Sequence, residues 1–396
     1  MAGPVARDFA TVCLLAACAG ILHTSLRTTA PLQVDSEVVK HMAPRKLRVG
    51  IAGTGGIARA VHIPGFQKLA DRVELVSAFD IAAERVTATG KEFGIPNVFT
   101  AFEQMLAGPA LDAVAICTPP KAHVPLTVQA LGRGLHVLCE KPAALTAAGA
   151  VEMVRAAERA DRILMIGFQH RFSRAEKALK RVIDGGELGE IYYSRAQSLR
   201  RRGIPGWGLF TNKEISGGGP MMDIGVHVLD QTVYLLGNPT PVSVFASTYQ
   251  KLGTRPGYNA FCPWDPATFE VEDFATASIK FANGSTLLLE ASWALNIPAN
   301  VHNVLLCGTQ GGAELSPLKI YTERHGMLFD MTLPESSQRG NENAQDEKIA
   351  HFVQCIEQGG QPITTPSEII NVALIIDAVY ASASSGRSVD IVQPGA

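Results

Sequence analysis

The sequence predicts a doubly wound α/β domain with a parallel sheet, followed by an α+β domain with a largely antiparallel sheet. The chain of 396 residues is long enough for roughly two to three domains. Between residues 45 and 168, apolar strands alternate with helices, which is typical of a parallel sheet covered on both faces. After about residue 190 the strands follow one another with few helices between them, which is typical of an α+β domain.

In the first domain, each expected strand is a short apolar run. Strands are expected over residues 47–52, 73–79, 97–100, 111–117, 135–139 and 163–167, and helices over 82–93, 122–132 and 146–160. The parallel arrangement follows because a helix separates most of these strands from the next one. We therefore expect a doubly wound α/β domain over residues 45–168.

The second domain, over residues 169–396, is expected to be built mainly from strands. They are expected over residues 191–198, 242–249, 274–281, 286–293, 301–307 and 318–322. Asn283-Gly284 lies between two of them and is typical of a hairpin turn. Helices over 344–358 and 366–384 finish the chain.

The composition excludes several classes of protein. Lys and Arg number 35 against 37 Asp and Glu, so a protein that holds nucleic acid by neutralising phosphates is not expected. The hydrophobic share of 46% is typical of a folded globular chain. Seven scattered cysteines, without a close Cys/His cluster, favour reduced thiols over a disulfide framework or a metal site.

Residues 1–44 form an extension ahead of the first strand. The apolar run over 9–22 is too short for a membrane span, so no integral membrane domain is expected. The run resembles a signal-peptide core, and Leu15-Ala16-Ala17-Cys18 fits a bacterial lipoprotein cleavage pattern. However, Asp8 offsets Arg7, and Met42 offers a natural start directly before the first strand. We expect a cytoplasmic protein, with export or lipid anchoring through residues 1–18 as the alternative.

A glycine-rich turn follows the first strand. In Gly53-Thr54-Gly55-Gly56-Ile57-Ala58 the glycines permit a tight turn and let the backbone approach a pyrophosphate. Asp80 ends the second strand, where a carboxylate can accept both ribose hydroxyls and repel a 2′-phosphate. These residues predict NAD(H) in preference to NADP(H), although Arg85 is close enough in sequence to leave dual use possible.

Two further motifs carry groups suited to hydride-transfer chemistry. Glu140-Lys141-Pro142 follows a parallel strand, at the sheet edge where α/β folds bind ligands, and Lys141 could donate to a substrate oxygen. Asp223 and His227 are four residues apart and should project from one face of a helix. A histidine with a pKa near neutrality can exchange the proton of an alcohol.

These motifs, together with Thr118-Pro119-Pro120 and His123, resemble the glucose–fructose oxidoreductase / inositol dehydrogenase / rhizopine-catabolism family. The resemblance extends from about Lys46 to Ser385-Gly386-Arg387-Ser388-Val389. It implies a dinucleotide-binding Rossmann domain over residues 45–168 and a second domain with an open-faced sheet that forms homodimers or homotetramers. The implied activity is oxidoreduction of a sugar or cyclitol. It also implies that Lys141 and His227 are catalytic, that Asp223 orients the substrate or the imidazole, and that Thr118, Pro119, His123 and Glu140 line the nicotinamide site.

The resemblance has two departures. The extension contains no twin-arginine pair, so a permanently bound cofactor is not implied. In Phe168-Gln169-His170-Arg171 many relatives have Asn before the Arg, so Gln169 is expected to place the substrate differently. Arg171, at a strand end, and Trp207, which follows Arg200-Arg201-Arg202, are candidate substrate contacts.

Two other functions remain open at this stage. A redox-neutral glycosidase that uses NAD transiently would need the same residues, and it differs from a dehydrogenase in that free NADH does not accumulate. A nucleotide-binding sensor or scaffold is the alternative outside the enzymes. The joint presence of Lys141, Asp223 and His227 argues against the sensor, because binding alone does not require these three groups.

Overall fold

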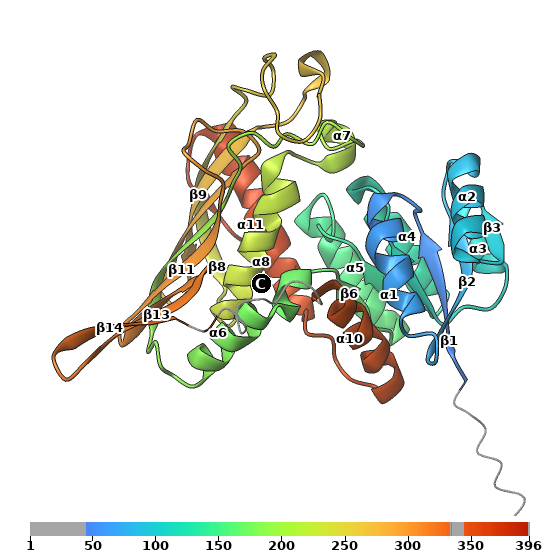
Figure 1. The fold of residues 1–396 in the computed structure, drawn as a ribbon, viewed down its shortest axis with the longest axis horizontal. Coiled ribbons are helices and arrows are strands. Elements are labelled where there is room, and N and C mark those ends of the chain that lie inside the picture. Colours follow the sequence, from blue (N-terminus) through green and yellow to red (C-terminus); the bar gives the residue numbers. More distant parts are fainter. Residues whose placement is uncertain (1–44, 333, 335–343, 395–396) are drawn as a thin grey trace, which may run out of the picture. The chain divides into compact units, whose positions relative to one another are not determined.

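The structure, a computed structural model, describes residues 45–332, 334 and 344–394 (Figure 1). The predictions for residues 1–44 lie outside the described residues. A six-stranded parallel sheet, sheet A, has the strand order β3-β2-β1-β4-β5-β6. Its strands are β1 (Leu47–Ala52), β2 (Val73–Phe79), β3 (Asn97–Phe99), β4 (Ala113–Ile116), β5 (His136–Cys139) and β6 (Leu164–Ile166). The strand order reverses between β1 and β4, the point where open α/β sheets bind ligands. This confirms the predicted Rossmann fold.

Helices cover both faces of sheet A. On one face, Met153 of α5 packs in a buried cluster with Val114 and Val137. On the other, Phe352 of α10 packs with Ile51, although α10 comes after β14 in the sequence. The helices of this part are α1 (Ile63–Gln67), α2 (Ala83–Phe93), α3 (Phe102–Ala107), α4 (His123–Gly132), α5 (Ala147–Ala160) and α10 (Ala344–Gln358), with the π-helical turn η1 (Ala58–His62) ahead of α1.

The second sheet, sheet B, has nine strands in the order β14-β13-β12-β11-β7-β10-β9-β8-β15. Only β7 and β10 pair in parallel among its described pairs, and the others are antiparallel. Its strands are β7 (Ile191–Leu199), β8 (Pro241–Tyr249), β9 (Phe274–Phe281), β10 (Thr286–Ser292), β11 (Val301–Gly308), β12 (Gly311–Leu315), β13 (Leu318–Arg324), β14 (Met327–Thr332) and β15 (Val389–Asp390). The sequence analysis missed β12, which begins with two glycines, β14, which is exposed along its whole length, and the two-residue β15.

Sheet B is covered on one face by helices. The helix α8 (Val226–Leu235), which follows the π-helical turn η4 (Met221–Gly225), and the helix α11 (Pro366–Ser385) pack against it (Figure 1). On β8, Val244 is 1% exposed beneath α11, whereas the alternate residue Phe245 is 54% exposed on the open face. Among the described residues α11 alone has the length and hydropathy of a membrane span, and 56% of that segment is buried inside the molecule, as in a core helix.

Candidate active site

The glycine-rich loop after β1 leaves its backbone open. Gly53 has a φ of +90°, and a Cβ atom there would lie 2.8 Å from the carbonyl oxygen of Cys117, so this position requires glycine. A Cβ atom on Gly55 or Gly56, by contrast, would meet no atom of the described residues within 4 Å. Ile57 beside them is 37% exposed. The loop therefore has the room that the pyrophosphate of a dinucleotide needs to approach the backbone.

Asp80, at the end of β2, is buried in a dense set of hydrogen bonds. Its Oδ2 accepts from Thr54 N at 2.8 Å and Oγ1 at 3.0 Å, and its Oδ1 accepts from Ala82 N at 3.0 Å. Arg85 lies across the carboxylate, with Nε 2.9 Å from Oδ2 and Nη2 2.5 Å from Oδ1. Burial acts to raise the pKa of Asp80, but these hydrogen bonds outweigh it and lower the pKa. Asp80 is therefore ionised and its charge is largely matched by Arg85.

His123 joins the loops that follow β4 and β5. It is 1% exposed, and its ring nitrogens lie 2.7 Å from the carbonyl oxygen of Pro142 and 2.8 Å from that of Thr118. A carbonyl oxygen only accepts, so the neutral ring of His123, whose pKa burial lowers, donates to one of the two oxygens and lies against the other; that His123 lines the nicotinamide site stays a prediction. Thr118 Oγ1 is buried without a hydrogen-bond partner among the described residues, and Pro119 beside it is exposed. A polar atom and an open surface are thus left for a cofactor here.

Glu140 is held by two buried side chains. Its Oε1 lies 2.8 Å from His62 Nε2 and 2.8 Å from Lys348 Nζ, and both partners are fully buried. Burial acts to raise the pKa of Glu140, but the Lys348 charge and the His62 hydrogen bond hold it well below its usual range. The carboxylate of Glu140 thus binds α10 to the end of β5, one residue before Lys141, and that Glu140 lines the nicotinamide site stays a prediction.

Lys141 and Asp223 meet where sheet A adjoins the second half of the chain. Lys141 Nζ donates to Asp223 Oδ1 at 3.0 Å and to the Asp223 carbonyl oxygen at 2.7 Å. The second oxygen, Oδ2, accepts from the indole N–H of the fully buried Trp293 at 3.1 Å. The two side chains remain 17% and 14% exposed, so a ligand can reach the pair. The ammonium group is thus fixed in place by a carboxylate that is itself held by an indole.

His227, at the start of α8, lies near Lys141. The region around Lys141, Asp223 and His227 is called the catalytic corner. The Nδ1 atom of His227 is buried without a hydrogen-bond partner among the described residues, and Asp223 directs its hydrogen bonds to Lys141 and Trp293. The expected contact of Asp223 with the imidazole is therefore not seen. Burial and the Lys141 charge hold the pKa of His227 well below its ordinary value, so the ring is neutral at pH 7.

Two more histidines extend this corner toward sheet B. The ring of His170 meets that of His227 edge-on, with centroids 5.0 Å apart, and lies 5.4 Å from the ring of His302 on β11. Burial, helped by His302 and Lys141, lowers the pKa of His170 to about 3. Among the described residues there is no group of three or more His, Cys, Asp or Glu side chains that could hold a metal ion. Because their pKa values are lowered, the rings of His170 and His302 are neutral polar groups near Lys141.

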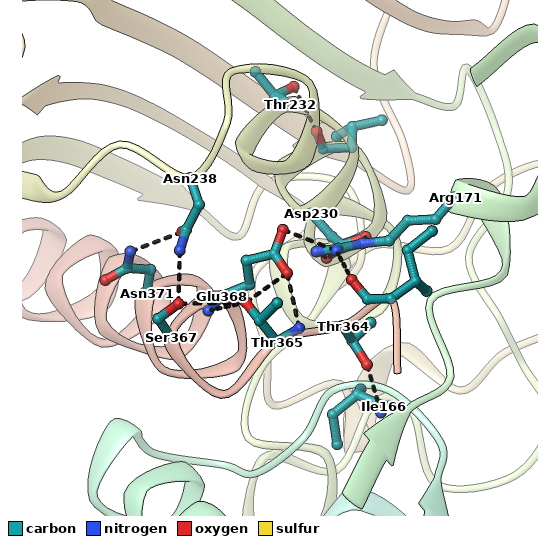
Figure 2. A network of polar contacts seen from close by, with 12 residues as sticks. Ile166, Arg171, Asp230, Thr232, Asn238, Thr364, Thr365, Ser367, Glu368 and Asn371 are labelled. Atoms are coloured by element: carbon teal, nitrogen blue, oxygen red, sulfur yellow. Dashed lines mark hydrogen bonds and ion pairs between the residues drawn. The ribbon is translucent and has the colours of Figure 1, made fainter. Parts of the chain in front are cut away.

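Arg171 does not contact this site. It is fully buried, with Nη2 2.6 Å from Asp230 Oδ1 and Nη1 2.9 Å from Glu368 Oε1 (Figure 2). It also donates to the carbonyl oxygen of Ile363 at 3.0 Å. The prediction that Arg171 binds substrate is therefore wrong, because the buried carboxylates on α8 and α11 take up its guanidinium and leave no exposed surface.

The sequence analysis missed several groups of the corner. Trp293, His302 and Arg200 come from strands or strand ends of sheet B, and only the three-dimensional pairing of β7, β10 and β11 brings them together. His170 stands beside Gln169 in a motif that the sequence analysis singled out, but nothing in that motif indicates a contact with His227. Trp207, the other predicted substrate contact, lies on a loop that follows Arg200 and is 51% exposed.

A parallel sheet of this order, with an open glycine loop after β1 and a Lys–Asp pair beside a neutral histidine, defines a Rossmann-fold, nicotinamide-dependent oxidoreductase. Comparison with known families agrees. A model described as "Oxidoreductase family, NAD-binding Rossmann fold" matches residues 47–168, and one described as "GFO/IDH/MocA C-terminal domain" matches residues 177–314. The chain belongs to the GFO/IDH/MocA oxidoreductase family, as the motifs indicated.

Relatives match almost the whole of the described chain. The D-glucoside 3-dehydrogenase of Escherichia coli strain K12 is 38% identical over 351 residues, covering 88% of this chain and 99% of the relative. The D-apiose dehydrogenase of Paraburkholderia graminis is 26% identical, covering 88% and 90%. Among solved structures, the aldose-aldose oxidoreductase from Caulobacter crescentus complexed with glycerol is 27% identical, with a TM-score of 0.72 over 88% of this chain and all of that one. Levoglucosan dehydrogenase in complex with NADH, at 23% identity and a TM-score of 0.76, shares the fold.

Proposed function

We propose that this protein transfers hydride between a nicotinamide cofactor and a hydroxyl-bearing or keto carbon of a sugar, sugar derivative or cyclitol. The observation that supports this most directly is the Lys141–Asp223 pair beside the neutral His227, at the carboxyl edge of sheet A. The names of the relatives, a glucoside 3-dehydrogenase and an apiose dehydrogenase, support a sugar as substrate. The cofactor, when bound, supplies the hydride acceptor or donor.

In the proposed mechanism each side chain has one task. His227 accepts the proton of the substrate hydroxyl, because a neutral imidazole at pH 7 has a nitrogen free to act as a base. Lys141 donates a hydrogen bond to the same oxygen and stabilises the negative charge that develops there. Asp223 keeps the ammonium group in position and can accept from a neighbouring hydroxyl. The indole of Trp293 fixes the direction of the Asp223 carboxylate.

The proposed cofactor site uses the open loop at Gly53, Gly55 and Gly56 for the pyrophosphate, and Thr118 and Pro119 near the nicotinamide. Asp80 favours NAD(H), because its carboxylate disfavours a 2′-phosphate. Arg85 weakens this preference, since it neutralises that carboxylate and is itself half exposed. We therefore expect NAD to be preferred by a modest factor, and Arg85→Ala to increase the preference, as measured by Kd for NADH and NADPH.

The test of the activity is the formation of NADH from NAD in the presence of a panel of sugars and inositols. His227→Ala should lower turnover by about 10²- to 10⁴-fold and leave the Kd for NAD unchanged. His325→Ala, at an exposed histidine in the turn between β13 and β14, is the matched control and should have no effect.

Three results would count against the proposed function. If His227→Ala abolishes NAD binding, His227 is not the base. If NAD is found bound but no sugar yields free NADH, a redox-neutral glycosidase replaces the dehydrogenase; if no nucleotide binds at all, only a scaffold remains.

We also propose that the protein is a homodimer or homotetramer that works in the cytoplasm. The open face of sheet B supports self-association, because Phe245 and Tyr249 are 54% and 40% exposed there. Cys117, Cys139, Cys262, Cys307 and Cys355 are all free thiols, which is usual in a reducing compartment. Light scattering of the purified chain and Phe245→Asp, which should dissociate the oligomer, would test the first proposal.

A further inference from the structure

Two loops beside the catalytic corner are held rigidly against each other. A Cβ atom on Gly206 would lie 1.9 Å from the carbonyl oxygen of Pro263, so the loop backbones are in direct contact. The side chain of Asn259 also binds both backbone groups of Ile204, at 3.1 Å to its N and 2.7 Å to its O. Any side chain that these loops expose is therefore presented in a defined position.

These loops expose a cluster of aromatic rings. The rings of Trp207 and Phe261 have centroids 5.7 Å apart, and the ring of Phe210 meets Trp207 edge-on at 6.3 Å. Trp207 is 51% and Phe261 49% exposed, although large aromatic side chains gain most when they are buried. Exposed aromatic groups on a rigid backbone are typical of a site that a ligand covers.

Arg200 connects this cluster to the catalytic corner. Its guanidinium lies 5.1 Å from the centroid of the Phe261 ring, and its Nη1 donates to the carbonyl oxygen of Gly203 at 3.1 Å. It follows directly after β7, and its backbone N–H donates to the carbonyl oxygen of Ser292 at 2.9 Å, one residue before Trp293, whose indole donates to Asp223. The aromatic surface therefore begins where the Lys141–Asp223 site ends.

We propose that Trp207, Phe261 and Arg200 form a binding site for the second ring of a glycoside, the ring that is attached to the one being oxidised. This inference rests on the proposed function and narrows its substrate class to glycosides and disaccharides. The flat C–H face of a sugar ring can stack on Trp207 or Phe261, while Arg200 can donate to one of its hydroxyls. Such a combination of an apolar platform with few polar groups is usual in ligand sites.

The test compares methyl glycosides with disaccharides that have the same ring at the non-reducing end. For the full chain with NAD, kcat/KM should be about tenfold higher for the disaccharide, as for one additional buried ring. Trp207→Ala and Phe261→Ala should remove this difference and leave kcat/KM for the methyl glycoside within about twofold. Tyr192→Ala, at an equally exposed aromatic residue near the start of β7, is the matched control.

Three outcomes separate this inference from the proposed function. NADH formation with equal kcat/KM for both sugars supports the function but overturns the inference. A change in oligomeric state of Trp207→Ala by light scattering, with the sugar preference kept, also overturns it, since the platform would then be an interface between copies. If no sugar yields NADH, the function fails, and calorimetric titration of wild type and Trp207→Ala with the same sugars decides the inference by binding alone.

Discussion

Replacing Arg171 with methionine tests whether this arginine stabilises the fold or contacts the substrate. The guanidinium has 0% exposure, and its partners Asp230 and Glu368 are 1% and 8% exposed in their side chains. At 2.6 Å, the attraction between Arg171 and Asp230 is about 6 kcal/mol if the effective dielectric constant is about 20. Because the desolvation of both charges offsets part of this, we expect Arg171→Met to lower the free energy of unfolding by about 3–5 kcal/mol.

The loss of unfolding free energy in Arg171→Met should grow as the pH rises. Burial already raises the pKa of Asp230 to about 6, and without Arg171 the pKa rises further. A carboxyl whose folded pKa lies above its unfolded value is stabilising below the unfolded pKa, and that stabilisation is lost as the pH rises through the folded pKa. The deficit of Arg171→Met should therefore be larger at pH 8 than at pH 5. Replacing Asp230 as well, by Asn, should recover part of it at pH 8.

Urea unfolding followed by tryptophan fluorescence measures these differences. The matched control is Arg59→Met, which breaks the exposed pair with Glu92 and should cost at most about 1 kcal/mol. Substrate KM, measured where the variant is folded, should stay close to that of the wild type. Unchanged stability together with a raised KM would refute this reasoning and restore Arg171 as a substrate contact.

Three other substitutions probe buried polar groups. Burial raises the pKa of Glu176 to about 8, so its carboxyl group is protonated in the folded protein at pH values where it is ionised in the unfolded chain. Between pH 5 and 8 the wild type should therefore lose up to about 1.4 kcal/mol of unfolding free energy per pH unit relative to Glu176→Gln, as measured by urea unfolding. The same dependence of stability on pH in both proteins would contradict this. Lys348→Met leaves Glu140 with one side-chain partner, His62, and should lower Tm by the equivalent of about 3–5 kcal/mol of unfolding free energy, which Lys348→Met/Glu140→Gln should partly restore. Trp293→Phe removes the donor to Asp223 and should lower kcat about fivefold with a smaller change in KM, consistent with one hydrogen bond of about 1 kcal/mol; a change in KM alone would count against it.

The part of the candidate site around the glycine turn follows from local chemistry, so the sequence predicts its backbone geometry. A positive φ at Gly53 is a property of a single turn, and Asp80 is placed by the end of its own strand. Short-range patterns of this kind also predicted β1 and β2 with the observed ends. Even here, the sequence does not show that Arg85 occupies the Asp80 carboxylate, because the side-chain geometry between α2 and β2 decides that.

The rest of the candidate site depends on pairing between distant segments, which a motif does not contain. Trp293 reaches Asp223 across 70 positions of the chain, and Lys348 reaches Glu140 across 208. Arg171 illustrates the same limit: at a strand end its charge suggests a ligand contact, and only the packing of α8 and α11 shows that its partners are internal. A charged residue near a site can therefore be assigned only after its burial is known.

Both buried ion clusters connect the C-terminal helices to the catalytic corner. Glu140, which Lys348 of α10 holds, directly precedes Lys141, and Asp230, which shares Arg171 with α11, lies about one helical turn after His227. Each cluster is stable only while both of its segments are packed, because separation would leave buried charges unpaired. The positions of His227 and of the Lys141 ammonium group therefore depend on α10 and α11, and partial unfolding of either helix should abolish the proposed activity before sheet A is lost.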